Sequence, residues 1–139
     1  MKKQTSITQV FLHSIAAVIA FAAASPLRAA DPLAATGYID DDDLEDVAVV
    51  TSPTTITVSL GNADGSYTVS AILSAPKNQQ ITYITLYDRD GDGDLDLIAT
   101  APASATSWYT YIWFGNGDGT FGARVTEKFS WPKGRRGFF

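Results

Sequence analysis

The chain contains the same succession of short motifs twice, and this repetition constrains its fold more than any other feature. The first copy has an acidic stretch, YIDDDDLEDVAVV (38–50), followed by the glycine turn GNADGSY (61–67). The second copy has DRDGDGDLDLIAT (88–100), followed by GNGDGTF (115–121). The acidic stretches start 50 residues apart, at 38 and 88, and the turns start 54 residues apart, at 61 and 115. One supersecondary unit therefore occurs twice.

The unit is built from β-strands. The segment 80–88, QITYITLYD, is rich in β-branched and aromatic residues and has no helical periodicity. The short apolar segment 96–101 predicts a buried strand, and WYTYIWF (108–114) predicts a strand that is covered on both faces. Segment 124–130 is a further candidate strand. Each unit thus offers about four short strands, and the glycine turns supply positive φ where the chain reverses.

The segment 54–60, TTITVSL, alternates apolar and polar residues. Alternation of this kind predicts a strand with one buried face and one face toward water. Three residues form the apolar face and three form the polar face: Ile56, Val58 and Leu60 against Thr55, Thr57 and Ser59.

The second acidic stretch concentrates five aspartates on alternate positions, and unit charges about 4 Å apart repel by about 1 kcal/mol even in water. A cation among the carboxylates would relieve that repulsion. Gly93, at the sixth position, allows the sharp turn that would wrap the side chains around one point. Oxygen ligands at positions 1, 3, 5, 7 and 9 suit Ca²⁺, and the fourth of them contributes its backbone carbonyl. The candidate ligands are Asp88, Asp90, Asp92, Asp94 and Asp96.

An EF-hand is the obvious comparison for this loop, but two features contradict it. Position 12 should be a bidentate Glu and is Ala99. The flanking segments should be helices, and both have the composition of strands. The pattern therefore indicates a calcium loop between two β-strands, with a solvated acidic turn that holds no ion as the alternative.

The acidic loop followed by FGNGDGTF resembles the FG-GAP or VCBS repeat, the blade unit of integrin-α-like β-propellers. The resemblance extends from Tyr38 to about Ser130. It implies an all-β fold with two four-stranded antiparallel blades of an incomplete β-propeller, and it implies Ca²⁺ as the cofactor of the loops.

The first acidic loop matches that pattern less well, because position 1 is Tyr38 and position 6 is Asp43 instead of Gly. Asp adopts positive φ more readily than most residues, so the turn is expected to survive with a weaker metal site. By the resemblance, its ligands would be Asp40, Asp42, Asp46 and the carbonyl of Leu44.

The units divide the chain into a signal peptide (1–30), a first blade with the degenerate loop (31–79), a second blade with the calcium loop (80–130) and a tail (131–139). Propellers close with about 4–8 blades, and two are visible. We therefore expect a fragment of a longer protein, with self-association of several chains or degenerate strands in the tail as alternatives.

The first 30 residues are typical of a Sec-type signal peptide, with Lys2 and Lys3 before an apolar run (10–24) and small residues at the end. The run is short for a membrane span of about 20 residues, so a membrane anchor is the weaker alternative. Cleavage is expected after one of three alanines: Ala24, Ala29 or Ala30. We expect a secreted, periplasmic or cell-surface protein with no membrane span after cleavage.

Composition excludes several classes of function. The chain has no Cys, and its one His lies in the signal segment, so the exported part would lack the commonest general base and the commonest zinc ligands. Removal of residues 1–30 leaves 7 basic and 15 acidic residues, a net charge of −8 that argues against nucleic-acid binding.

The expected function is a secreted, calcium-binding module for adhesion or for surface or protein recognition, with an unknown protein or glycan as its partner. The alternative is a carbohydrate-binding propeller or a non-catalytic part of a polysaccharide-degrading enzyme. Sugars would then stack on a set of aromatic residues: Trp108, Tyr109, Tyr111, Trp113 and Phe114. A core role suits these residues better, because the run is continuous and strand-like. An enzymatic role, such as part of a polysaccharide lyase with Glu45 and Glu127 as acid and base, has little support, because nothing in the sequence places the two together.

Overall fold

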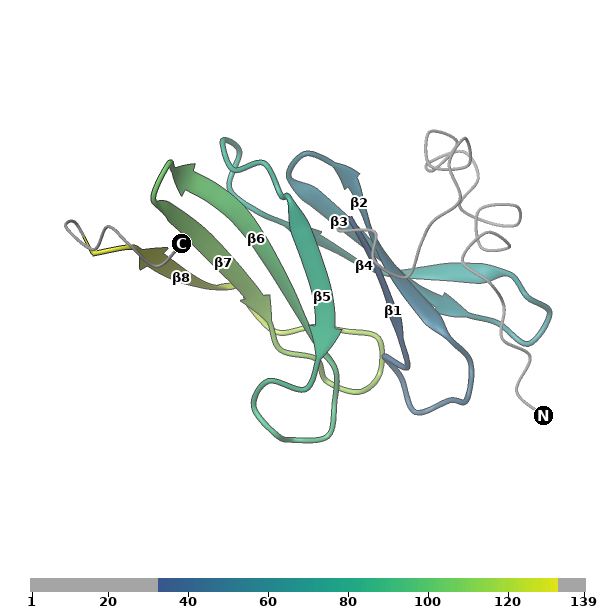
Figure 1. Ribbon diagram of the computed structural model, residues 1–139. Helices are drawn as coiled ribbons and strands as arrows, with labels where there is room; N and C mark the ends of the chain where they lie inside the picture. Colours follow the sequence, from purple (N-terminus) through teal and green to yellow (C-terminus); the bar gives the residue numbers. More distant parts are fainter. Residues whose placement is uncertain (1–32, 133–139) are drawn as a thin grey trace, which may run out of the picture.

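The computed structural model describes residues 33–132, which form two four-stranded antiparallel sheets (Figure 1). In each sheet the strands follow one another in sequence order, so every connection is a hairpin. The first sheet comprises β1 (Ala34–Gly37), β2 (Asp46–Ser52), β3 (Thr55–Gly61) and β4 (Tyr67–Ser74). The second comprises β5 (Tyr83–Tyr87), β6 (Asp96–Ser104), β7 (Ser107–Trp113) and β8 (Val125–Ser130).

The all-β fold class is confirmed, with two four-stranded antiparallel sheets of the kind that form propeller blades. The expected signal peptide (1–30) and most of the expected tail (133–139) lie outside the described residues. Between residues 33 and 132, no helix has the length and apolar character needed to cross a membrane.

The strands of the second sheet coincide with the segments that sequence patterning selects. Strand β7 has Tyr111, Ile112 and Trp113 almost fully buried, as expected for a strand covered on both faces. Strand β5 begins only at Tyr83, because the preceding Ile81 instead donates its backbone N–H to the carbonyl of Pro53 in the other sheet.

The predicted alternation of β3 holds in direction, but one of its polar residues does not face water. The register of β3 with β2 is regular, so Ser59 lies on the same side as Thr57. The register shift between β3 and β4 comes from an extra residue in β4, Ser70, which is a β-bulge of that strand. Ser59 is nevertheless fully buried, and Leu60 packs half-buried against the core.

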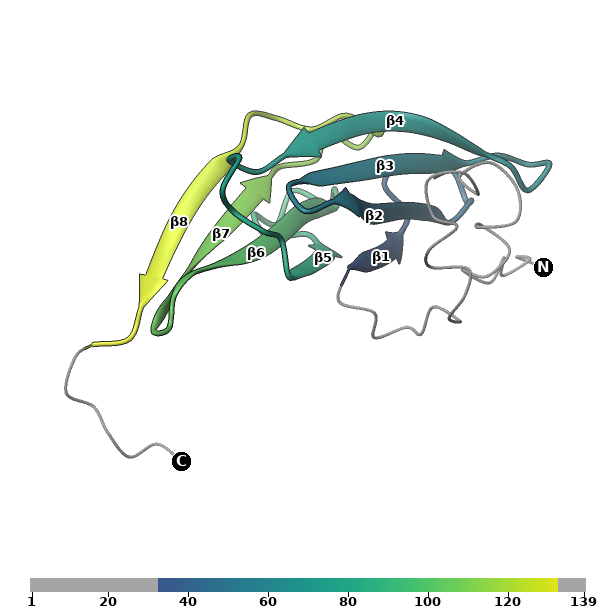
Figure 2. The same ribbon diagram turned by 90° about the horizontal axis from the view of Figure 1, so that it is seen from above.

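The two sheets share one hydrophobic core. Figures 1 and 2 show them side by side, with β1 next to β5, and with β4 and β8 at the outer edges. Ile56 and Val58 of the first sheet belong to the same buried cluster as Leu97, Tyr111 and Trp113 of the second. Full burial of such a side chain contributes about 1.5–3 kcal/mol, so the shared core stabilises both sheets.

Candidate metal centre

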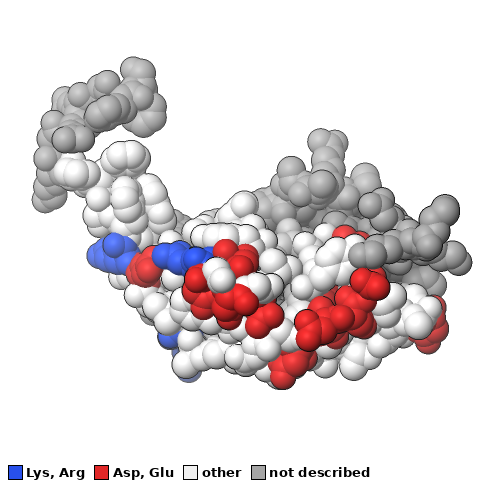
Figure 3. Space-filling model, turned by 90° about the horizontal axis from the view of Figure 1, so that it is seen from below, with Lys and Arg blue, Asp and Glu red and all other residues white. Residues whose placement is uncertain are grey.

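The two acidic stretches occupy equivalent places in the two sheets. One connects β1 to β2 and the other connects β5 to β6, and both project from the same end of the molecule (Figure 1). Seen from below, that end carries two concentrations of acidic side chains (Figure 3). The repeat in the sequence therefore places two clusters of carboxylates close to each other on one surface.

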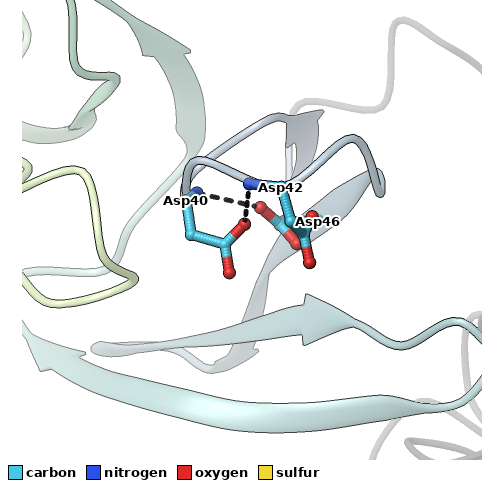
Figure 4. Close-up of side chains that lie close together, drawn as sticks. All are labelled: Asp40, Asp42 and Asp46. Atoms are coloured by element: carbon cyan, nitrogen blue, oxygen red, sulfur yellow. Dashed lines mark hydrogen bonds between the residues drawn. The ribbon is translucent and has the colours of Figure 1, made fainter.

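The first loop brings together Asp40, Asp42 and Asp46, three of its four candidate ligands. One carboxylate oxygen from each lies within 4.8 Å of the others, and the side chains converge in Figure 4. The loop reaches this shape through local hydrogen bonds. The Asp42 backbone N–H donates to Asp40 at 3.1 Å, and the Leu44 N–H donates to Asp42 at 2.8 Å.

The second loop brings together Asp88, Asp90 and Asp96, again within 4.8 Å. The other two candidates are placed differently. The Asp92 carboxylate accepts the backbone N–H of Asp94 at 2.9 Å. The Asp94 carboxylate lies against the Cα of Gly117, so close that a Cβ there would be 2.6 Å from its oxygen. Neither Asp92 nor Asp94 belongs to the group of three.

The last aspartate of each loop, Asp46 or Asp96, is fully buried and satisfied by backbone donors. Asp46 accepts the N–H of Ile39 at 2.6 Å and that of Gly61 at 2.9 Å. Asp96 accepts the N–H of Arg89 at 2.7 Å and that of Gly115 at 2.9 Å. Each residue thus connects its acidic loop to the glycine turn of the same sheet. Sequence reasoning treated these residues only as metal ligands and missed this structural role.

The glycines that donate to these aspartates could not be replaced without moving the backbone. A Cβ on Gly61 would lie 2.6 Å from the carbonyl oxygen of Glu45, and a Cβ on Gly115 would collide with that of Leu95. The sequence signal for this close contact is the Gly-Asn pair that recurs at the start of both turns. A glycine at a fixed distance after a buried strand often marks a close approach of two backbones.

The two loops close differently. In the second, Gly91 and Gly93 have φ of 81° and 101°, and the Asp88 carboxylate accepts backbone N–H groups from both, at 2.7 and 2.9 Å. The first loop has Tyr38 in place of Asp88, and no residue other than glycine has positive φ among residues 33–132. Asp43 therefore does not adopt the left-handed conformation expected for it, and the first loop turns by another path.

The glycine turns repeat one hydrogen-bond network in both sheets. Asp118 Oδ1 accepts the Thr120 N–H at 2.9 Å and its hydroxyl at 2.5 Å, while Asn116 donates to the same hydroxyl at 2.9 Å. Asn62, Asp64 and Ser66 make the corresponding bonds in the first sheet. The shared network shows that the duplicated sequence gives duplicated local structure.

The crowding of carboxylates in the loops affects their pKa values. Four carboxyl groups have a pKa above the usual 3.8: Asp40, Asp46, Asp90 and Asp94. Loss of hydration is the largest cause in each case, and neighbouring carboxylates add to it. The pKa of Asp118 is lowered instead, because its carboxylate accepts the two hydrogen bonds from Thr120. Without a cation, the ionised loops are therefore electrostatically unfavourable.

The two candidate sites meet at the junction between the sheets. Asp40 of the first loop forms an isolated antiparallel bridge with Asp118 of the second sheet's turn. Gly119 packs so closely on Leu60 that a Cβ at position 119 would lie 2.7 Å from the Leu60 side chain. The charge of Asp41, in the first loop, raises the pKa of Asp94 in the second.

The two candidate catalytic residues, Glu45 and Glu127, come from different parts of the fold. The Glu127 carboxylate accepts two hydrogen bonds from the Arg89 guanidinium, at 3.0 and 2.9 Å, on the second sheet. Glu45 lies in the acidic loop of the first sheet, where its carbonyl faces Gly61.

Comparison with known proteins identifies the repeat. The family model described as FG-GAP-like repeat matches residues 39–99, which include both acidic loops and strands β2 to β4 of the first sheet. Neither a search of curated proteins nor a search of solved structures gave a match. The chain thus contains an FG-GAP-like repeat at residues 39–99, and the duplicated loops and the two blade-like sheets agree with this match.

Proposed function

We propose that the chain is an exported, calcium-binding β-propeller-type repeat module that serves in adhesion or in surface or protein recognition. The observation that carries the metal assignment is the convergence of three carboxylates, within 4.8 Å, in each of two equivalent loops. Convergence at two equivalent places is a stronger argument than one acidic turn.

The chemistry of the donors favours calcium over softer metals. Carboxylate and backbone carbonyl oxygens are hard ligands, and Ca²⁺ accepts six to eight of them in flexible geometry. The first site would use Asp40, Asp42 and Asp46 with the carbonyl of Leu44. The second would use Asp88, Asp90 and Asp96 with the carbonyl of Asp94, and Asp92 would join when its side chain turns from the Asp94 N–H toward the ion.

Titration calorimetry tests the metal assignment directly. Extracellular calcium modules bind with Kd on the order of 10⁻⁴–10⁻³ M, and the purified protein should give heat in that range. Asp90→Asn should remove the second site. Asp64→Asn is the matched control, because it removes one acidic charge outside both clusters. Absence of calcium heat in the unsubstituted protein, or equal loss in the two variants, would refute the assignment.

Export is supported by residues 1–30, whose basic start, apolar run and small-residue end have the form of a signal peptide. Expression in an exporting bacterial host, followed by mass measurement of the product, tests this part. A product outside the cytoplasm that begins after one of the alanines between 24 and 30 is expected. An uncleaved product retained in the membrane would contradict it.

The carbohydrate-binding alternative loses part of its aromatic set, because Tyr111 and Trp113 belong to the core. Trp108 remains half-buried, with its ring 4.8 Å from that of the exposed Phe129. A glycan array probed with and without calcium distinguishes the two functions, since binding to one class of glycan would favour carbohydrate binding. We propose no catalytic role, and release of unsaturated sugars from acidic polysaccharides would overturn that view.

A further inference from the structure

The two faces of each sheet can be matched between the repeats through the strand register. Ala48 pairs with Val58 in the first sheet, and Ile98 pairs with Ile112 in the second. The offsets of the acidic loops and of the turns make Ala48 equivalent to Ile98, and Val58 equivalent to Ile112. Ala48 and Val58 lie in the core shared with the second sheet. The equivalent face of the second sheet therefore points away from the first sheet.

This outer face of the second sheet is rich in exposed aromatic and aliphatic side chains. Strand pairing places four of them on one side of the sheet: Tyr83, Tyr87, Val125 and Phe129. Trp131 joins them through ring contacts with Trp108 and Phe129, and each of the five has 42–51% of its surface exposed. They surround Ile98 and Ile112, which are buried. The carboxylate on the same face, Glu127, is paired with Arg89, so the face holds no uncompensated charge at that point. An exposed apolar face of this kind marks an interaction surface.

The face of the first sheet that points away from the second also carries exposed apolar residues. Ile72 pairs with Thr57, and Val69 pairs with Ser59, which places both on this back face. Their exposed fractions are 67% and 53%. By the same offset, Thr57 is equivalent to Tyr111, which lies on the face that the second sheet packs against the first.

We propose that the outer face of the second sheet docks on the back face of the first sheet in a second copy of this chain. The reason for this occupant is that the contact would repeat the junction already present between the two sheets. In that junction, the core face of the first sheet, which is equivalent to the outer face of the second, packs on the core face of the second sheet, which is equivalent to the back face of the first. A second copy supplies both partners of the contact with the same register and the same twist.

Such a contact is heterologous, since two different surfaces of the chain meet. Heterologous contacts form a closed ring when the rotation closes and a filament when it does not. Blades stacked in this way close into propellers of about four to eight blades, so a closed ring is the expected form. Two to four copies would then form one ring with an even number of blades.

Two charge substitutions on the two faces test the proposal. Phe129→Asp blocks the outer face and Ile72→Asp blocks the back face, and both residues are exposed, so the fold should be retained. Light scattering behind a sizing column, in millimolar calcium, should show assembly of the unsubstituted protein and a monomer for each variant. An equimolar mixture of the variants should give a one-to-one dimer, because each supplies the face that the other lacks.

Phe129→Ser and Ile72→Ser serve as neutral counterparts, and circular dichroism checks the fold of every variant. A monomeric unsubstituted protein overturns the proposal and would leave the outer face to the blades of a longer chain. If the Ile72→Asp variant still assembles, the proposal is overturned as well. Assembly would then use a symmetric contact between two outer faces, which does not involve Ile72. A mixture that stays monomeric has the same consequence.

Discussion

Asp96 accepts a hydrogen bond from the backbone N–H of Gly115 at 2.9 Å, across 19 positions of the chain. Asp46 and Gly61 form the same bond at 2.9 Å in the other sheet. Each bond ties the acidic loop of a sheet to the turn that follows its third strand. Both carboxylates are fully buried, so water cannot replace the bonds if they are lost.

Replacement of Asp96 by Ala should lower the free energy of unfolding by about 2–3 kcal/mol, because buried N–H groups lose a charged acceptor. Denaturant unfolding in the presence of a chelator measures this loss without any contribution from bound metal. Asp41→Ala is the control, since it removes an exposed carboxylate of the other loop. Equal stability of the two variants would show that the buried carboxylate is unimportant for the fold.

Gly61→Ala should destabilise the fold by about 2 kcal/mol or more, because the added Cβ meets a backbone carbonyl that cannot move freely. Gly122→Ala is the matched control. A Cβ at Gly122 lies 3.7 Å from its nearest neighbour, which is ordinary contact, and its φ is not positive. Thermal unfolding of both variants should show a large fall in Tm only for the first.

The second loop should bind calcium more tightly than the first. Asp88 holds the second loop in shape through three backbone N–H groups, whereas Tyr38 stands at the equivalent position of the first. Terbium luminescence of single-loop variants ranks the loops: Asp92→Ala should remove more signal than Asp42→Ala. Tyr38→Asp should raise the signal of the first loop, and the opposite ranking would refute the order.

The pKa shifts predict a reversal of pH dependence by calcium. A carboxyl group whose pKa is raised in the folded state binds protons more tightly there, so stability rises as pH falls through the raised pKa toward 3.8. In a chelator, the Tm should therefore increase on mild acidification from neutral pH. With calcium bound, protons compete with the ion, and the Tm should decrease over the same range. Slopes of the same sign in both buffers would contradict the assignment of the clusters as metal sites.

The sequence predicted most of the strands because their β-branched and aromatic residues have a clear pattern, as in β7. Strand β1, with the sequence AATG, has no such pattern and forms because it pairs with β2. The burial of Ser59 was not predictable either, since its alternation with Val58 and Leu60 indicates a side chain that faces water.

The candidate site was predictable in position but only partly in geometry. Alternating aspartates indicate a metal loop, and the same spacing equally suits a buried carboxylate that caps backbone N–H groups, as Asp96 does. The turn glycine at 93 was correctly identified as a residue that needs positive φ, and the substitute at 43 does not adopt it. Side-chain spacing alone does not distinguish these uses of one motif.

The bridge between Asp40 and Asp118 makes the contact between the two sheets directional along the chain. The acidic loop of the first sheet rests on the turn of the second, whereas among residues 33–132 no later sheet supports the loop at 88–96. The first loop therefore depends on the second sheet for a backbone bridge, whereas the second loop meets the first sheet through the Leu95 side chain, which packs on Gly37. Loss of the second sheet would loosen the backbone of the first loop, while loss of the first sheet would remove a side-chain contact from the second loop.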